Sequence, residues 1–136
     1  MTFNEIRAAI EVRASTWSML NGTPPIAYDG LAPSAAVVAA QNAKSPWVRL
    51  TIIDGDSFTA CIGDRPEPRR TGVIMLEIYT KRDTGSAEAR RVADSLAAHF
   101  EYWQEGKLST NAGRIVSVPA ETNYYRRNFM IGFEAD

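Results

Sequence analysis

Residues 69–100 decide the fold; they read RRTGVIMLEIYTKRDTGSAEARRVADSLAAHF. This stretch predicts a strand over Gly72–Thr80, a short loop with a glycine, and an amphipathic helix. Both faces of the strand are partly apolar, with Ile74, Leu76 and Ile78 on one and Val73, Met75 and Tyr79 on the other, where Glu77 is the lone charge. The helix has a single apolar stripe, made of Ala89, Val92, Ala93, Leu96, Ala97, Phe100 and Trp103. Because one helix covers only one face of a sheet, the second face needs another cover, which in a small domain can be a second copy of the protein.

The N-terminal segment, Thr2–Leu20, predicts the first helix. Thr2 and Glu5 have the spacing of a capping box, in which each side chain accepts from the other residue's backbone N–H. An apolar stripe follows, made of Phe3, Ile6, Ile10, Trp17 and Leu20. Asn21-Gly22 predicts the end of this helix, and Pro24-Pro25 prevents its continuation.

The next part of the chain predicts short strands around one ambiguous segment. Ile26–Tyr28 reads as a short extended piece, and residues 29–44 as either a brief helix from Ser34 through Ala40 or a long loop that orders on assembly. Trp47–Ile53 then predicts a strand, Asp54-Gly55-Asp56 a tight turn, and Ser57–Ile62 the return strand, because an Asp-Gly pair between apolar runs is a strong hairpin signal.

The C-terminal part predicts the late helix and two closing strands. Gly63–Thr71 is a polar connection, Ser86 is placed to cap the late helix, and this helix is expected to end near Glu105. The closing strands are expected at Arg114–Val118 and Tyr124–Phe133. The order α-β-β-β-β-α-β-β predicts a single α+β domain over residues 1–136, with a largely antiparallel sheet and helices packed on one face.

Composition restricts the classes of partner. The 136 residues are 45% hydrophobic and 23% charged, with a formal net charge of −1, so no global basic excess exists for binding phosphate backbones. The lone cysteine, Cys61, excludes an intramolecular disulfide and any zinc site built on several thiolates. The N-terminus has no signal-peptide pattern, and no apolar run approaches the roughly 18 residues of a membrane span. We therefore expect a soluble protein that is made in the cytoplasm and contacts no membrane.

Catalytic chemistry has little support in the sequence. The single histidine, His99, is expected to be a half-buried structural residue on the flank of the late helix. Asp54 and Asp56 fit a hairpin turn better than a D-x-D metal site, and neither a nucleotide-binding glycine motif nor a G-x-S-x-G elbow is present. We predict no catalytic, cofactor or metal site and no enzyme activity. A small hydrolase using His99 with Ser57 or an aspartate is the weakest alternative.

Arginine and tyrosine residues are the best candidates for partner contacts, because both side chains are enriched where proteins meet. The candidates are Arg65, Arg69 and Arg70 in the polar connection, and Arg126 and Arg127 beside Tyr124 and Tyr125 in the last strand. The alternative is a solvated loop and an edge strand protected by charge against aggregation. The sequence leaves both interpretations open.

Three segments carry a resemblance: WVRLTIIDGDS, RRTGVIMLEIYTKRDTG and SAEARRVADSLAAHFE. Together they resemble the phage tail terminator-like proteins of long, non-contractile tails, a family that includes small prophage proteins. The similarity runs from Phe3 to Phe133 and includes the proline-bearing segment at residues 24–28 and the Arg-Thr-Gly-Val start of the central strand. One departure lies at residues 29–33, where Asp-Gly-Leu-Ala-Pro stands in place of the family's Asn before Phe-x-Pro.

The resemblance implies a structural protein of the virion. Such a protein forms a ring, commonly a hexamer, on the head-proximal end of a finished tail tube. It stops further polymerisation and offers a surface to neck or head-completion proteins, so the implied partners are further copies of the chain, the tube protein and a neck protein. DNA passes through the lumen, which is therefore expected to be acidic or neutral. The alternative within the virion is another neck or tail ring component.

Two hypotheses about residues follow. Met75, Glu77 and Tyr79 are expected to contact a neighbouring subunit or to line the ring interior. The stretch from Arg65 to Arg70 is expected to reach a subunit or tube partner.

Overall fold

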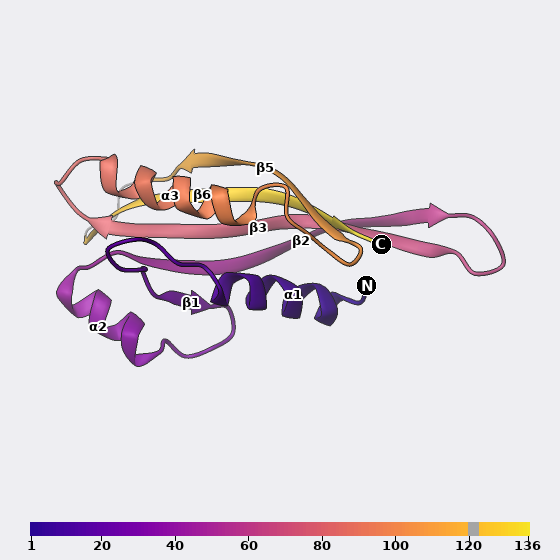
Figure 1. Cartoon of the computed structure of the whole chain (residues 1–136), viewed down its shortest axis with the longest axis horizontal. Helices are drawn as coiled ribbons and strands as arrows, with labels where there is room; N and C mark the ends of the chain where they lie inside the picture. Colours follow the sequence, from indigo (N-terminus) through magenta and orange to yellow (C-terminus); the bar gives the residue numbers. More distant parts are fainter. Residues whose placement is uncertain (120–122) are drawn as a thin grey trace.

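A six-stranded sheet forms the centre of the molecule, with the strand order β1-β2-β3-β6-β5-β4 (Figure 1). The computed structural model describes residues 1–119 and 123–136. Its elements are α1 (Phe3–Ser15), β1 (Ile26–Tyr28), α2 (Ala35–Ala43), β2 (Trp47–Cys61), β3 (Glu67–Lys81), α3 (Ala87–Phe100), β4 (Gln104–Glu105), β5 (Leu108–Ser117) and β6 (Tyr124–Ala135). Among the described strands, β1 and β2 pair in parallel and the other pairs are antiparallel. The predicted α+β class and element order are confirmed.

Helix α1 begins as predicted and ends earlier. The capping box is present, with the Thr2 hydroxyl accepting from the Glu5 N–H at 3.1 Å and the Glu5 carboxylate accepting from the Thr2 N–H at 2.7 Å. The predicted end near Leu20 is wrong, because the hydroxyls of Ser15 and Thr16 donate to carbonyls three residues back and compete with the helical pattern. Leu20 is therefore exposed, although the stripe placed it in the core.

Residues 35–43 form α2, which resolves the ambiguous segment as a helix. The Ser34 hydroxyl accepts from the Val37 N–H at 3.3 Å and so caps the first turn. At the other end Lys44 has a φ of 54°, the left-handed conformation that commonly terminates helices. This helix buries Val37 and Ala40 against Trp47 and Tyr79.

The predicted hairpin turn at residues 54–56 is wrong, because β2 continues through it to Cys61. A type I′ turn needs positive φ at both central residues, and Gly55 does not have it. The segment instead forms an irregularity in the pairing with β3, where the Thr71 hydroxyl donates to the Asp56 carbonyl at 2.7 Å. The two strands consequently form one long hairpin that turns at residues 62–66 and projects beyond the body (Figure 1). We call residues 57–68 the arm.

Helix α3 and the closing strands lie near their predicted positions with shifted bounds. The helix ends at Phe100, because the backbone of Glu101 is extended, so the buried Trp103 belongs to the segment after the helix. Ser86 occupies the N-cap position without a side-chain capping bond. Strand β5 starts at Leu108, earlier than predicted, and is preceded by the short β4.

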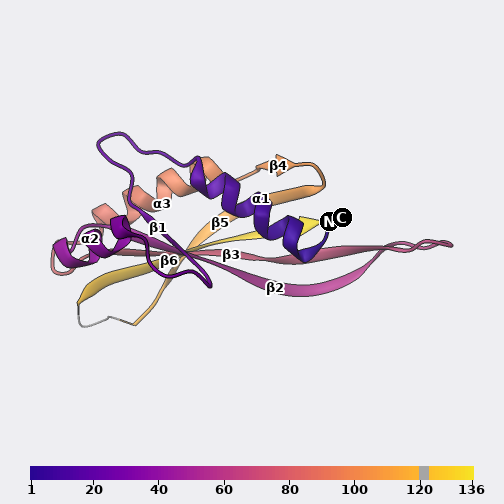
Figure 2. The ribbon, with the colours of Figure 1, turned by 90° about the horizontal axis from the view of Figure 1, so that it is seen from below.

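Helices α1 and α3 cover the same face of the sheet (Figure 2). Their stripes pack on alternate residues of β2, β3 and β6, and the largest fully buried side chains of this core include Phe100, Ile6, Ile10, Leu50, Ile74, Leu76, Ile78, Leu96, Leu108 and Ile131. One face of the predicted two-faced strand is thus buried within the chain. The chain termini lie side by side at the arm's base (Figure 2), where the Met1 ammonium donates to the Asp136 carbonyl. Within the described residues, no helix has the length and apolar character needed to cross a membrane.

Candidate interaction surfaces

The second face of the sheet is only partly covered by the chain's own helices. Helix α2 covers one end of it, and beyond that end an apolar row remains open. We call this row, with the charged residues at its edges, the open patch; it comprises Ile53, Val73, Met75, Met130 and Val116, with Arg49 on β2 and Arg114 on β5. Its apolar members are half-buried, except Ile53, which is 42% exposed. A contiguous apolar row with charged edges is typical of a protein–protein contact.

An aromatic cluster closes the α2 end of this face. The Trp47 and Tyr79 rings stack with centroids 4.1 Å apart, and Tyr124 packs edge-on against Tyr79 at 5.8 Å. The Tyr124 hydroxyl also donates to the Gln41 carbonyl of α2 at 2.9 Å. Tyr79 is therefore 4% exposed within the single chain, and Tyr124 is half-buried.

Glu77 is a buried carboxylate beside this cluster. Its Oε2 accepts from the Tyr79 hydroxyl at 2.5 Å, and the Arg126 Nε lies 3.8 Å away. Burial, and secondarily this hydrogen bond, raise the pKa of Tyr79 well above its usual value. Of the three residues predicted to face a neighbour, Glu77 and Tyr79 are therefore covered by their own chain, whereas Met75 is half-exposed in the open patch.

Two buried polar atoms on this face have no hydrogen-bond partner among the described residues: Trp47 Nε1 and Asn128 Oδ1. Asn128 is 7% exposed, and its amide nitrogen donates a hydrogen bond to the Met75 sulfur at 3.5 Å. Buried polar atoms are normally satisfied in native proteins. An acceptor next to Met75 is therefore placed to receive a donor from a molecule that covers the open patch.

The arm separates Arg65 from the two arginines that the sequence grouped with it. Arg65 is exposed on the tip, and Phe58 and Ile62 on the arm are 50% and 95% exposed. At the base, Arg69 donates to the Asp136 carboxylate at 2.5 Å, and Arg70 donates to the Met1 carbonyl at 3.2 Å. Arg69 and Arg70 thus fasten the chain termini, while Arg65 remains free for a partner.

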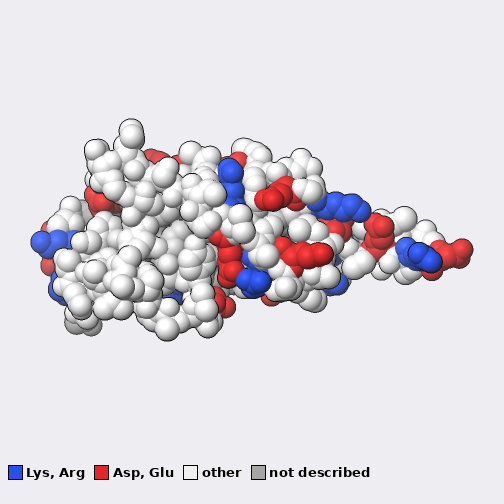
Figure 3. All heavy atoms as spheres, turned by 60° about the horizontal axis from the view of Figure 1, so that its bottom comes forward, with Lys and Arg blue, Asp and Glu red and all other residues white. Residues whose placement is uncertain are grey.

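A surface almost without charge was missed by the sequence analysis. Residues 14–43 contain one charged side chain, Asp29. They lie at the α2 end of the molecule, where Figure 3 shows a broad area without Lys, Arg, Asp or Glu, bordered by charged side chains at its margins. Leu20, Leu31 and Val38 are exposed there. Thirty consecutive residues with one charge were the signal that could have indicated an interaction surface.

The two residues considered for catalysis, His99 and Ser57, lie in different parts of the structure, and each makes a structural hydrogen bond. His99 is half-buried, as predicted, and its Nε2 bonds the Arg13 carbonyl at 2.6 Å. Burial, and secondarily the nearby Arg13 charge, lower the pKa of His99 against the opposing effect of this hydrogen bond. Ser57 is on the arm and accepts from Arg70 at 3.4 Å. Across the described residues, no group of three or more His, Cys, Asp and Glu is arranged to bind a metal ion.

Comparison with known proteins agrees with this architecture. A solved structure superposes on the chain with a TM-score of 0.71 at 19% sequence identity, covering 100% of this chain and 96% of the other, which shows a shared fold. No curated protein matches the chain. The family model described as phage tail terminator protein matches residues 5–125. The chain belongs to the phage tail terminator family and is a structural protein of phage tails.

Proposed function

We propose that this protein forms a ring on the head-proximal end of the tail tube, where it ends tube polymerisation and provides the docking surface for head and neck proteins. The proposal rests on family membership and on one observation, the open patch. The chain covers one face of its sheet and leaves an apolar row on the other. A tail protein with such a face is suited to bury it against another chain.

The chain presents different surfaces in different directions, as a cap requires. The open patch lies on one face of the sheet, the arm projects from one end, and the α2 end, with its area of few charges, lies opposite the arm (Figures 1 and 3). Unlike surfaces favour head-to-tail contacts, which close into a ring when the rotation between copies permits. A subunit that binds the tube through one surface and exposes another gives the next tube subunit no matching site.

The charge of the open patch supports a protein contact over a lining for DNA. Arg49, Arg114 and the adjacent Arg126 outnumber Glu77 and Glu134 around the open patch. A basic lumen would attract the phosphate backbone and retard DNA passage. Other residues therefore line the lumen in this proposal, and the open patch forms a contact between proteins.

Electron microscopy of virions that carry a labelled copy of this protein tests the proposal. A single layer of label at the head-proximal end of each tail is expected, and tails grown without the protein should be overlong and without heads. Label repeated along the tube would identify a tube component instead. Label only on the head side of a detached neck would identify a neck ring, and either result would overturn the cap.

A further inference from the structure

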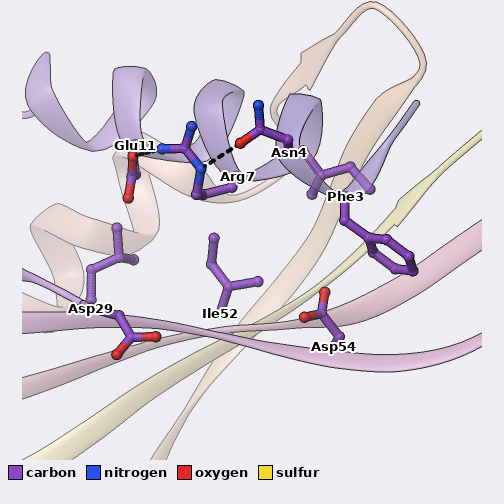
Figure 4. Close-up of a pocket in the computed structure, with 9 residues that line it drawn as sticks. Phe3, Asn4, Arg7, Glu11, Asp29, Ile52 and Asp54 are labelled. Atoms are coloured by element: carbon purple, nitrogen blue, oxygen red, sulfur yellow. Dashed lines mark hydrogen bonds and ion pairs between the residues drawn. The ribbon is translucent and has the colours of Figure 1, made fainter.

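We infer that the open patch of one copy binds a hollow beneath α1 of the next copy; this deepens the proposed ring function and rests on it. The hollow has a volume of about 360 Å³ and lies between α1 and the outer edge of β2 (Figure 4). Its apolar lining includes Phe3, which is 56% exposed, and the half-buried Ile52. We call it the α1 hollow.

The α1 hollow carries an excess of negative charge. Asp29 and Asp54 lie on either side of Ile52 and both line the hollow; the Asp54 carboxylate points toward α1, whereas the Asp29 carboxylate points away from it (Figure 4). Arg7 is already occupied, because it bonds Glu11 and the Asn4 side chain. Neither Asp29 nor Asp54 has a hydrogen-bond or ion-pair partner within the described part of the chain.

The open patch carries the opposite excess. Arg114 is exposed and has no carboxylate partner among the residues that the structure describes, and Arg49 stacks over the Trp47 and Tyr79 rings without an ion pair. Of the carboxylates on this face, Glu77 accepts from Tyr79 and lies 3.8 Å from Arg126, and Glu134 lies at the far end of the patch, two residues beyond Gly132 on β6. The face thus offers two uncompensated arginines to the two uncompensated aspartates of the hollow.

The charges of the two surfaces indicate whether the open patch binds a second open patch or the α1 hollow of another copy. Packing two open patches against each other would bring arginines near arginines, and packing two hollows would bring aspartates together. Juxtaposed like charges suppress an association, whereas opposite potentials favour it and fix its register. The pairing of patch with hollow is head-to-tail, since the two surfaces lie on opposite faces of the same sheet, and this is the symmetry that a ring needs.

The spacing of the charges is compatible with this pairing. From strand geometry, Arg49 and Arg114 are separated by three strand spacings and two residues along the strand, roughly 15 Å between backbones. Asp29 and Asp54 are separated by one spacing and about three residues, roughly 11 Å. Flexible arginine side chains span this difference. Met75 and Met130, between the arginines, are unbranched side chains able to fill an irregular apolar hollow.

Complementary charge reversals test the inference. One variant carries Arg49→Glu and Arg114→Glu, and a second carries Asp29→Lys and Asp54→Lys. Self-association is measured by light scattering in solution and by electron microscopy on tail-tube ends. Each variant alone should associate about 100-fold more weakly than wild type, roughly tenfold for each reversed pair. An equal mixture should recover assembly, because the acidic patch of the first variant matches the basic hollow of the second. A control with Lys81→Glu and Arg90→Glu, both exposed outside the two surfaces, should assemble normally.

The possible outcomes separate the inference from the proposed function. If both folded variants form rings as wild type does, the pairing is wrong and the cap remains in place with another interface. If the variants fail and their mixture does not recover, the two surfaces do not bind each other, and the inference is again overturned. If wild type forms no ring in solution or on tube ends, the proposed function itself fails. Circular dichroism and urea unfolding establish that each variant is folded.

Discussion

Arg13 and His99 bind each other's backbone carbonyl groups where the C-terminal ends of α1 and α3 meet. The Arg13 Nη2 donates to the His99 carbonyl at 2.6 Å, and the His99 Nε2 lies 2.6 Å from the Arg13 carbonyl. A carbonyl only accepts, so Nε2 carries a proton. This reciprocal pair joins the two helices that cover the core, and it places an imidazole beside a guanidinium.

The first prediction concerns pH. The pKa of His99 is lowered in the folded state, so the unfolded chain binds its proton at a higher pH than the native chain does. Between the unfolded pKa of about 6.5 and the lower native pKa, the free energy of unfolding therefore falls as the pH falls. Urea unfolding from pH 7 to 5 should show a smaller pH slope for His99→Gln than for wild type. Equal slopes would contradict a neutral native His99, and loss of ring assembly by a folded His99→Gln would contradict a purely structural role.

The second prediction concerns Gly72, in the Arg-Thr-Gly start of β3. A Cβ built there would lie 2.6 Å from the Ile53 carbonyl oxygen and 2.6 Å from the Phe133 ring. Gly72→Ala should therefore reduce the free energy of unfolding by about 1–3 kcal/mol, the usual effect of overpacking. The matched control is Gly132→Ala on the neighbouring strand, where a Cβ meets only ordinary contacts. Equal stability of the two variants in urea would contradict the close approach at Gly72.

The third prediction concerns the buried Glu77. Replacing Tyr79 by Phe removes the hydroxyl that donates to this carboxylate and leaves the stacked ring in place. A buried acceptor that loses its donor destabilises a protein by about 1–3 kcal/mol. Tyr102→Phe, at a tyrosine that is 77% exposed, should change stability little. The comparison is made by urea unfolding; a neutral Tyr79→Phe would mean that Arg126 alone satisfies Glu77.

The fourth prediction separates the arm tip from the arm base. Arg65→Glu should leave unfolding unchanged, because Arg65 is exposed and makes no hydrogen bond or ion pair with the described residues, and it should weaken binding to a tube or a neighbouring subunit. The paired reversal of Arg69 and Arg70 should lower stability as well, since it breaks the contacts with Asp136 and Met1. The Arg69 hydrogen bond also lowers the pKa of Asp136, so the exposed pair should weaken at high salt. Both variants are compared by thermal unfolding and a tube-binding assay; normal binding by Arg65→Glu would contradict a role for the tip.

Local signals predicted the parts of the fold that local chemistry determines. The capping box of Thr2 and Glu5, the alternation of β3 and the stripe of α3 each depend on residues a few positions apart, and all three are present. The turn predicted at Asp54-Gly55 is wrong because strand pairing with Gly72 and Arg70, and the Thr71 hydroxyl on the Asp56 carbonyl, keep this segment extended. A local turn signal was overridden by a long-range strand pairing.

In the candidate interaction surfaces, too, the features set by nearby residues could be predicted and those set by long-range contacts could not. The two-faced pattern of β3 indicated an uncovered row, and Met75 lies in it. The sequence could not show that α2 folds over Tyr79, or that Asp136 returns to Arg69, because these contacts join residues more than 35 positions apart. The α1 hollow was equally hidden, since Asp29 and Asp54 come together only when β1 pairs with β2.

The central claim is that another chain covers the apolar row that this chain leaves open. Light scattering of a Met75→Glu, Met130→Glu variant over a range of concentrations, in solution and with tail tubes, tests it most directly. The control is Val12→Glu, at an exposed position on α1 outside the open patch and outside the lining of the α1 hollow. We predict that wild type and the control assemble while the folded double variant remains a monomer. Assembly of the double variant at wild-type concentrations would contradict the account.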